Sequence, residues 1–354
     1  MAEYSAMNQL SRTALFASLF KDVPEYRARQ FASALFLPYL SGFEEVPGLP
    51  KAMRETLQEN MRWLSLEPAQ VFQGKKGDTH KAILRLSGGE RIETVLMQNA
   101  RGHWTVCVSS QVGCAMACTF CATGKMGFTR NLSADEIIDQ YRFWLGYLHA
   151  RPEIPQYISN IVFMGMGEPL ANYAEVRTAL NTLLTYTEIG PTRITVSTVG
   201  LLPMLERLLD DPEWPPVRLA VSLHSADGAT RRAIMPSSYD AFLEKLLEWT
   251  GKYFEKFQSR RRHLTFEYVM LSKVNDSVRH AEALIRFARR VGKVRINLIP
   301  YNFTGEVYRD SLPGDFDRFE AKLREAGVQV TRRRTMGDDI AAACGQLIVE
   351  KTSA

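Results

Sequence analysis

A repeated strand, loop and helix pattern begins at residue 104 and constrains the fold more than any other feature of the sequence. Six such units in series predict an α/β domain with a parallel sheet, and near-continuous apolar strands predict burial on both faces. We therefore expect a partial (β/α)6 TIM-like barrel. The strand candidates are 104–109, 160–165, 193–198, 217–223, 264–271, 294–300 and a weaker one at 328–334.

The chain before this repeat has a different pattern of apolar and polar residues. Residues 1–80 carry apolar side chains at helical intervals and predict a helical accessory domain. β-branched runs on both sides of a Gly-Gly turn predict a β-hairpin extension over 81–103. The barrel domain then takes 104–348. A chain of 354 residues with 45% apolar side chains can bury a sizeable core of this kind.

The chain reads as a cytoplasmic protein. Its first residues lack the long apolar run of a signal peptide, and no stretch approaches the roughly 20 apolar residues of a membrane span. Only 5 cysteines occur, and three of them cluster, which favours a reducing compartment and a metal or catalytic role over disulfides. We expect a monomer with no membrane partner.

Short basic runs raise the question of a polyanionic partner, since the net charge is +5. They could form a phosphate-binding face or simply a solvated surface, and the sequence leaves both open. The runs are Lys75-Lys76, Arg260-Arg261-Arg262-His263 and Arg332-Arg333-Arg334.

The stretch GCAMACTFCATG contains Cys114, Cys118 and Cys121 at the spacing C-x3-C-x2-C. Structural zinc normally takes four ligands, and haem attachment needs a histidine where this chain has Ala122. Iron-sulfur clusters are held by cysteine thiolates in short loops, usually four of them. Three thiolates on a [4Fe-4S] cluster leave one iron free to bind a substrate. In the expected barrel this loop follows the first strand, at the carboxyl edge where barrel chemistry occurs.

This cysteine loop resembles that of the radical SAM superfamily, and ordered motifs narrow the resemblance to the RlmN/Cfr family of RNA adenosine methyltransferases. The likeness covers residues 91–348, with a looser helical likeness before it. It rests on ETV, VCVSSQVGC, FCATG, GFTRNL, FMGMGEPL, TVSTVG, VSLH, EYVML, VNDS, INLIPYN and GDDIAAACGQL.

The resemblance implies a set of roles. One S-adenosylmethionine (SAM) methylates Cys344, and a second gives the 5′-deoxyadenosyl radical that takes hydrogen from that S-methyl group. Cys107 then releases the product through a transient disulfide with Cys344, and Glu93 accepts a proton. Residues expected to contact SAM are Gly167, Glu168, Ser197, Ser222, Leu223, His224 and Asn302. The implied cofactors are one [4Fe-4S] cluster per chain and two SAM per methylation, with flavodoxin or its reductase system as electron donor.

Within the family, enzymes of the RlmN type methylate C2 of an adenosine in the peptidyl transferase region of 23S rRNA and of the adenosine 3′ of the tRNA anticodon. Enzymes of the Cfr type methylate C8 and confer antibiotic resistance. Pro169 and GFTRNL favour C2 methylation, in rRNA and tRNA processing, over the Cfr-like alternative. The segment SSYDAF, 237–242, departs from the family pattern. A radical SAM enzyme for small substrates and a simple electron carrier are the other classes, and neither needs Cys107 or Cys344.

Overall fold

The computed structural model describes residues 11–257, 264–292, 294–305 and 308–348. Its main sheet contains ten strands in the order β1-β2-β3-β4-β7-β8-β9-β10-β11-β12. From β4 onward neighbouring strands are parallel and follow the chain order. These strands are β4 (Trp104–Cys107), β7 (Ile158–Phe163), β8 (Ile194–Thr198), β9 (Arg218–Ser222), β10 (Leu264–Met270), β11 (Arg295–Pro300) and β12 (Gln329–Arg332).

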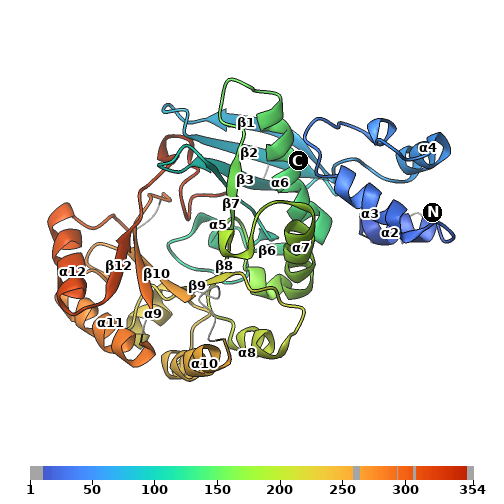
Figure 1. Cartoon of the computed structure of the whole chain (residues 1–354). Helices are drawn as coiled ribbons and strands as arrows, with labels where there is room; N and C mark the ends of the chain where they lie inside the picture. The colour runs from blue at the N-terminus through green and yellow to red at the C-terminus, as the bar shows by residue number, and fades with distance from the viewer. Residues whose placement is uncertain (1–10, 258–263, 293, 306–307, 349–354) are drawn as a thin grey trace.

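A helix connects each parallel strand to the next, and Figure 1 shows these helices along the outer side of a curved sheet. In α11, apolar residues at helical intervals form the buried face, from Ala281 through Leu284 and Ala288 to Val291. The fold is thus mixed α/β with a large parallel sheet, as predicted. The connecting helices are α6 (Ala134–His149), α7 (Tyr173–Tyr186), α8 (Leu202–Asp210), α10 (Phe242–Lys256), α11 (Val278–Val291) and α12 (Pro313–Glu325).

Three antiparallel strands extend the sheet beyond β4: β1 (Leu66–Gln73), β2 (Thr79–Leu86) and β3 (Arg91–Gln98). β2 and β3 form the hairpin that the Gly-Gly turn indicates. β1 lies within the segment for which helices were expected. Most of its side chains are exposed, so no alternation of apolar and polar residues marks it as a strand.

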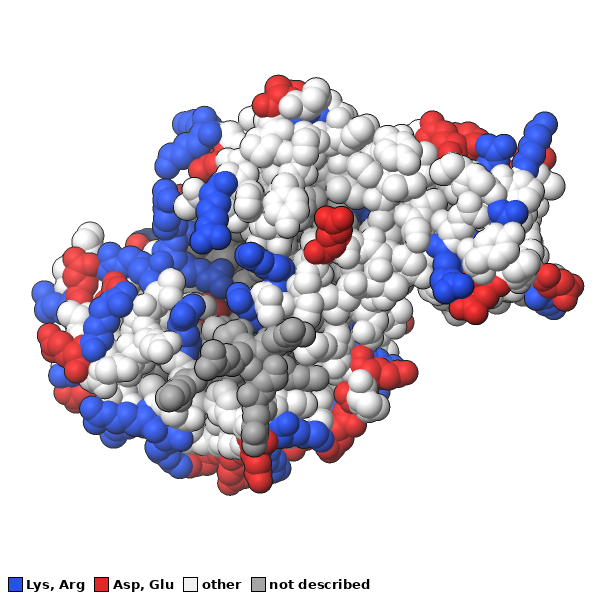
Figure 2. Space-filling model, viewed as in Figure 1, with Lys and Arg blue, Asp and Glu red and all other residues white. Residues whose placement is uncertain are grey.

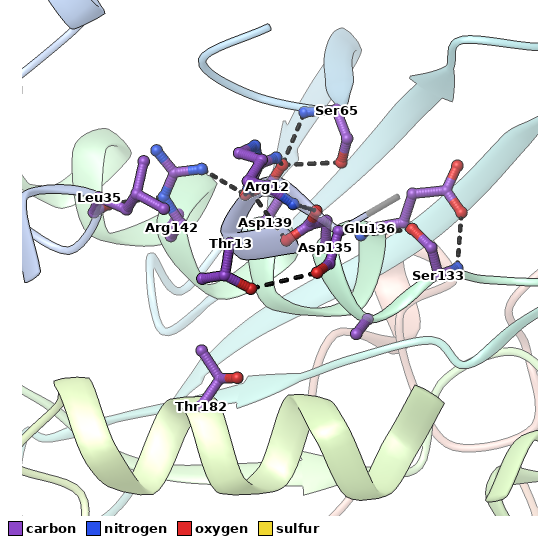
Figure 3. Close-up of polar contacts among 12 residues, drawn as sticks. Arg12, Thr13, Leu35, Ser65, Ser133, Asp135, Glu136, Asp139, Arg142 and Thr182 are labelled. Atoms are coloured by element: carbon purple, nitrogen blue, oxygen red, sulfur yellow. Dashed lines mark hydrogen bonds and ion pairs between the residues drawn. The ribbon is translucent and has the colours of Figure 1, made fainter. Parts of the chain in front are cut away.

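The N-terminal helices are α2 (Arg12–Leu19), α3 (Glu25–Ala34), the short η1 (Phe43–Glu45) and α4 (Lys51–Asn60). Their buried side chains, Phe16 and Phe31 among them, belong to the same apolar cluster as the sheet. Polar contacts to α6 add to this packing. The carboxylate of Asp139 on α6 binds Arg12 of α2 and Ser65 of the linker before β1 (Figure 3).

Short elements complete the chain around the loops. A second sheet of two strands, β5 (Gln111–Gly113) and β6 (Phe128–Asn131), flanks the cysteine loop and the short α5 (Ala122–Lys125). The others are η2 (Pro169–Asn172), η3 (Pro191–Arg193), α9 (Gly228–Ile234) and η4 (Asp338–Ile340). None of the helices in the described residues combines the length and apolar character needed to span a bilayer.

Candidate functional site

A cavity of about 1020 Å³, including its open mouth, lies at the carboxyl ends of the parallel strands. This is the edge where α/β barrels carry their chemistry, because the loops after each strand meet there. Most of the residues singled out from the sequence line it. They are Cys114, Cys118, Cys121, Gly167, Glu168, Ser197, Ser222, His224 and Cys344.

The cysteine loop is held by main-chain hydrogen bonds. Cys114 N donates to Gly127 O at 2.9 Å, and Cys121 N donates to Cys118 O at 3.1 Å. Gly124 must be a glycine, because a Cβ there would lie 2.9 Å from the main-chain N and O of Cys118. The loop therefore has little freedom to rearrange.

The chemistry of this donor set fits an iron-sulfur cluster, because three thiols of one short loop line the same cavity. Among the described residues no three Cys, His, Asp or Glu side chains converge as ligands of one ion. Each thiolate of an iron-sulfur cluster binds a different iron, so convergence is not required. Burial raises the pKa of Cys114 to about 12 and also raises that of Cys118. Thiolates at such positions need a bound metal group to stabilise their charge.

The turn after β7 needs its glycines. Gly167 has a φ of +99°, and a Cβ there would lie 2.6 Å from Gln111 Cβ. Glu168 is buried, and its carboxylate accepts hydrogen bonds from Leu170 N at 2.9 Å and Val199 N at 2.8 Å. Burial raises the pKa of Glu168 to about 7. This carboxylate and the adjacent main chain offer acceptors to an ammonium group.

His224 follows β9 with a φ of +53°. Its Nδ1 accepts a hydrogen bond from Val269 N at 3.0 Å, and burial lowers its pKa to about 3, so the ring is neutral. The ring meets Phe120 edge to face, with centroids 4.9 Å apart. The neighbouring Leu223 is fully buried and does not line the cavity.

The loop that carries Cys344 closes one side of the cavity. Asn302, which follows β11, does not line the cavity but donates through Nδ2 to Cys344 O at 3.0 Å. Ala122 N donates to Gly345 O at 2.8 Å, which joins this loop to the cysteine loop. Part of Cys344 reaches solvent, yet protein atoms crowd its thiol. This desolvation raises the pKa of Cys344, whereas the charge of Arg333 opposes the rise.

Cys107 ends β4 and is buried, and it does not line the cavity. Burial, and next the nearby Cys344, raise its pKa to about 12. Cys107 and Cys344 thus lie near enough for charge on Cys344 to affect Cys107, although most of the parallel sheet separates them in sequence. Both are free, and the cation of Arg333 acts on both.

Glu93 on β3 does not line the cavity. Its Oε1 lies 2.9 Å from Lys81 Nζ, and its Oε2 accepts a hydrogen bond from Ile348 N at 3.0 Å. Burial raises the pKa of Glu93, against the opposing charge of Lys81. Glu93 therefore contacts the end of the Cys344 loop.

Sequence reasoning missed two charged residues of the cavity, Glu267 and Arg333. Arg333 Nη2 lies 3.4 Å from Glu267 Oε2, and Asn297 Nδ2 donates to Glu267 Oε1 at 2.7 Å. A carboxylate in the middle of the apolar strand LTFEYVML was the available signal. In the sequence, Arg333 belongs to a basic run that predicts a phosphate-binding or solvated surface.

The other basic residues have mixed surroundings. Lys75 and Lys76 are exposed, whereas Arg332 pairs with Glu320 at 3.0 Å. The run 260–263 lies outside the described residues. In the view of Figure 2, Lys and Arg side chains gather around a hollow in the left half of the molecule. The N-terminal helices on the right carry both basic and acidic side chains.

Comparisons with known proteins identify the family. Residues 108–288 match the model of the Radical SAM superfamily. A dual-specificity RNA methyltransferase RlmN from Desulfotalea psychrophila is 40% identical over 93% of this chain and 91% of its own length. Another, from Anaeromyxobacter dehalogenans, is 42% identical over 94% and 89%.

The chain belongs to the RlmN family of radical SAM RNA methyltransferases. A crystal structure of a radical SAM methyltransferase from Sphaerobacter thermophilus is similar, with 38% identity, a TM-score of 0.86 and coverage of 95% of this chain and 97% of the other. RlmN family membership confirms the resemblance drawn from the ordered motifs, and it implies a [4Fe-4S] cluster and SAM as cofactors.

Proposed function

We propose that this enzyme forms 2-methyladenosine in the peptidyl transferase region of 23S rRNA and at the adenosine 3′ of the tRNA anticodon, through a methyl group carried on Cys344. The observation that carries this proposal is the position of Cys344 on the same cavity as the three clustered cysteines. The relatives named as dual-specificity RNA methyltransferases support RNA as the substrate.

The three cysteines would hold the [4Fe-4S] cluster, and a partial barrel with open loops at the carboxyl edge leaves room for SAM beside it. When bound, the cluster and SAM supply a strong organic radical by reductive cleavage. Gly167 and Glu168 would receive the SAM ammonium through main-chain and carboxylate acceptors. Ser197, Ser222 and the neutral ring of His224 offer uncharged polar contacts from the adjacent strand ends.

Cys344 has two tasks in this proposal. As a thiolate it takes a methyl group from SAM, and the nearby cation of Arg333 favours that thiolate. As an S-methyl cysteine it then presents a hydrogen atom and, after losing it, a carbon that bonds to the adenine ring. Asn302 positions the thiol by holding Cys344 O. The target base must leave its stack to reach this cavity, because ring carbons are inaccessible in a helix.

Cys107 and Glu93 act after the carbon-carbon bond has formed. The ring adduct first gives up one electron, which replaces the electron consumed in cleaving SAM. The thiolate of Cys107 then attacks the sulfur of Cys344: the S–S bond forms, the C–S bond breaks, and its electron pair stays on the product carbon, which takes up a proton. Glu93 serves as the proton acceptor for the adenine ring, and it contacts the end of the Cys344 loop at Ile348. Its raised pKa suits a group that must accept a proton near neutral pH.

The proposal also covers the domains of the chain, its partners and its location in the cell. We take residues 1–80 as the accessory domain, whose helices precede β1, 81–103 as the hairpin extension, and 104–348 as the barrel with its Cys344 loop. The accessory helices add RNA contacts. A flavodoxin or its reductase system delivers electrons to a cytoplasmic monomer. Pro169 after Glu168 favours C2 over the Cfr-like C8 position.

The direct test is an anaerobic reaction of the reconstituted enzyme with SAM, reductant and unmodified rRNA or tRNA fragments. Mass spectrometry of the digested RNA should reveal 2-methyladenosine. A product that is only 8-methyladenosine would transfer the assignment to the Cfr type, and neither product would refute the proposed reaction.

A further inference from the structure

Arg231 in α9 is buried, with 1% of its surface exposed, yet it has no carboxylate within ion-pair distance among the described residues. Its guanidinium donates instead to three main-chain carbonyls: Val199 O at 2.8 Å, Ser222 O at 3.1 Å and Leu223 O at 3.1 Å. The Cζ atom of Arg231 also lies 3.6 Å from the centroid of the Phe242 ring. Arg231 thus joins the carboxyl ends of β8 and β9, from which SAM contacts are expected.

A buried cation without a counter-ion is costly, because carbonyl dipoles replace only part of its hydration. Burial lowers the pKa of Arg231 to about 9, which still leaves the group charged at neutral pH. Such a charge is stabilised when an anion occupies the space next to it. No described carboxylate lies within ion-pair distance of Arg231, which leaves an anion bound in the adjacent cavity as its candidate partner.

The helix that carries Arg231 rests directly on the cysteine loop. Thr119, which lies between Cys118 and Cys121, donates to Ile234 O at the end of α9 through its N at 3.0 Å and its Oγ1 at 3.2 Å. Met235, whose N donates to Arg231 O at 2.8 Å, lines the cavity. The positive charge of Arg231 favours the thiolate of Cys118, against its burial and the charges of Cys121, Cys114 and Glu168.

We propose that Arg231 is a positioning residue that provides the counter-charge for the thiolate-bound cluster and raises its reduction potential. This inference rests on the proposed function, in that a [4Fe-4S] cluster occupies the three cysteines. The potential of such clusters depends on net charge, hydrogen bonds and solvent exposure. A fixed cation beside the cluster favours the state that has gained an electron. The three carbonyl contacts keep this cation buried, where solvent does not screen it.

The experiment compares cluster potentials in the full-length protein after anaerobic reconstitution, by redox titration followed by EPR in the absence of SAM. The variants are Arg231→Gln, which removes the charge, and Arg231→Lys, which keeps it. Arg232→Gln is the matched control, since Arg232 lies on the same helix but is exposed and paired with Asp240. Iron and sulfide content is measured for each.

At a fixed solution potential, the ratio of reduced to oxidised cluster in the glutamine variant should fall roughly tenfold, equal to about 59 mV for a one-electron couple. At about pH 6, where an ammonium group is normally charged, the lysine variant should stay within roughly threefold of the wild type. The Arg232→Gln control should also stay within roughly threefold, because exposed charges are screened.

An unchanged ratio in a fully loaded Arg231→Gln protein would overturn the proposal, and so would a tenfold loss in the lysine variant. If the glutamine variant does not retain its cluster, the lysine variant decides between these results. A wild type that holds the cluster but methylates no adenosine would refute the proposed function and leave this measurement intact. Normal methylation with unshifted variants would refute only the role of Arg231.

Discussion

Cys344 and Cys107 lie beside the same arginine but differ in access to solvent, and this difference separates their expected roles. Replacing Cys344 with Ala should reduce methyladenosine formation to background, because no other exposed cysteine among the described residues can carry the methyl group. Mass spectrometry should also find no methylated cysteine in this variant. Residual activity within roughly tenfold of wild type would contradict the role of Cys344.

Replacing Cys107 with Ala should block a later step. The methyl carbon would still reach the adenine, but no second thiol could release it from Cys344. We expect RNA covalently attached to the protein, visible as a shifted band on a denaturing gel and removed by nuclease. The Cys344→Ala, Cys107→Ala double variant is the control and should give no adduct. Free methylated RNA at wild-type rates from Cys107→Ala would contradict this assignment.

Some site residues could be predicted from sequence and others could not. The three clustered cysteines and Glu168 stand in short contiguous motifs, so their residue types and spacing predict their roles. Arg231 and Arg333 look like surface cations, since each belongs to a short basic run. Only the fold shows that their side chains turn inward, one beneath the strand ends and the other into the cavity.

The loop around Cys344 depends on a glycine that admits no side chain. Gly337 has a φ of +69°, and a Cβ there would lie 2.6 Å from Thr79 Cγ2 and 2.9 Å from Ala342 Cβ. Gly337→Ala should therefore displace the loop and lower methyl transfer roughly tenfold, because small misplacements of reacting groups are costly. The iron content should stay normal.

Gly327 provides the matched control. It has a φ of +79°, but a Cβ there would meet nothing within 4 Å. Gly327→Ala should cost about 1 to 2 kcal/mol of stability from backbone strain alone and leave methyl transfer unchanged. Single-turnover assays and thermal unfolding of both variants check this pair. Equal losses of activity would show that loop position is not the cause.

The parallel strands and their helices could be predicted because burial on both faces leaves long apolar runs and amphipathic patterns. β5 and β6 could not, since each is very short and most of β6 is exposed. Their pairing is fixed by contacts across the cysteine loop, such as Cys114 N to Gly127 O, and not by local pattern. The sequence does not predict α9, because its seven residues are too few to show a helical repeat of apolar side chains.

A buried ionic group connects the N-terminal helices to α6, which packs on the parallel sheet (Figure 3). Asp139 on α6 accepts hydrogen bonds from Arg142 Nη1 at 2.5 Å, Arg12 Nη1 at 3.0 Å and Ser65 N at 2.6 Å. Arg142 Nε also donates to Leu35 O at 2.6 Å. Asp139→Asn leaves two buried cations without their shared anion and should destabilise the protein by about 3 to 5 kcal/mol. Chemical denaturation measures this loss.

The same group predicts a pH dependence. Burial would raise the pKa of Asp139, but the charges of Arg12 and Arg142 outweigh it and hold the pKa below its usual value of 3.8. The unfolded chain then binds the proton more readily, so the contribution of Asp139 is complete above about pH 4 and is lost as the pH falls through the folded pKa. The acid unfolding profile of Asp139→Asn should lack this component. If the stability of the wild type and of Asp139→Asn fell equally as the pH is lowered, this role of Asp139 would be contradicted.

The route of the methyl group is the most direct test of the proposed reaction. Enzyme whose Cys344 carries a deuterated methyl group is given unlabelled SAM and unmodified RNA for a single turnover, and the RNA nucleosides are analysed by mass spectrometry. We predict 2-methyladenosine whose methyl group carries deuterium from Cys344. First-turnover 2-methyladenosine without deuterium would show that the methyl group does not pass through Cys344.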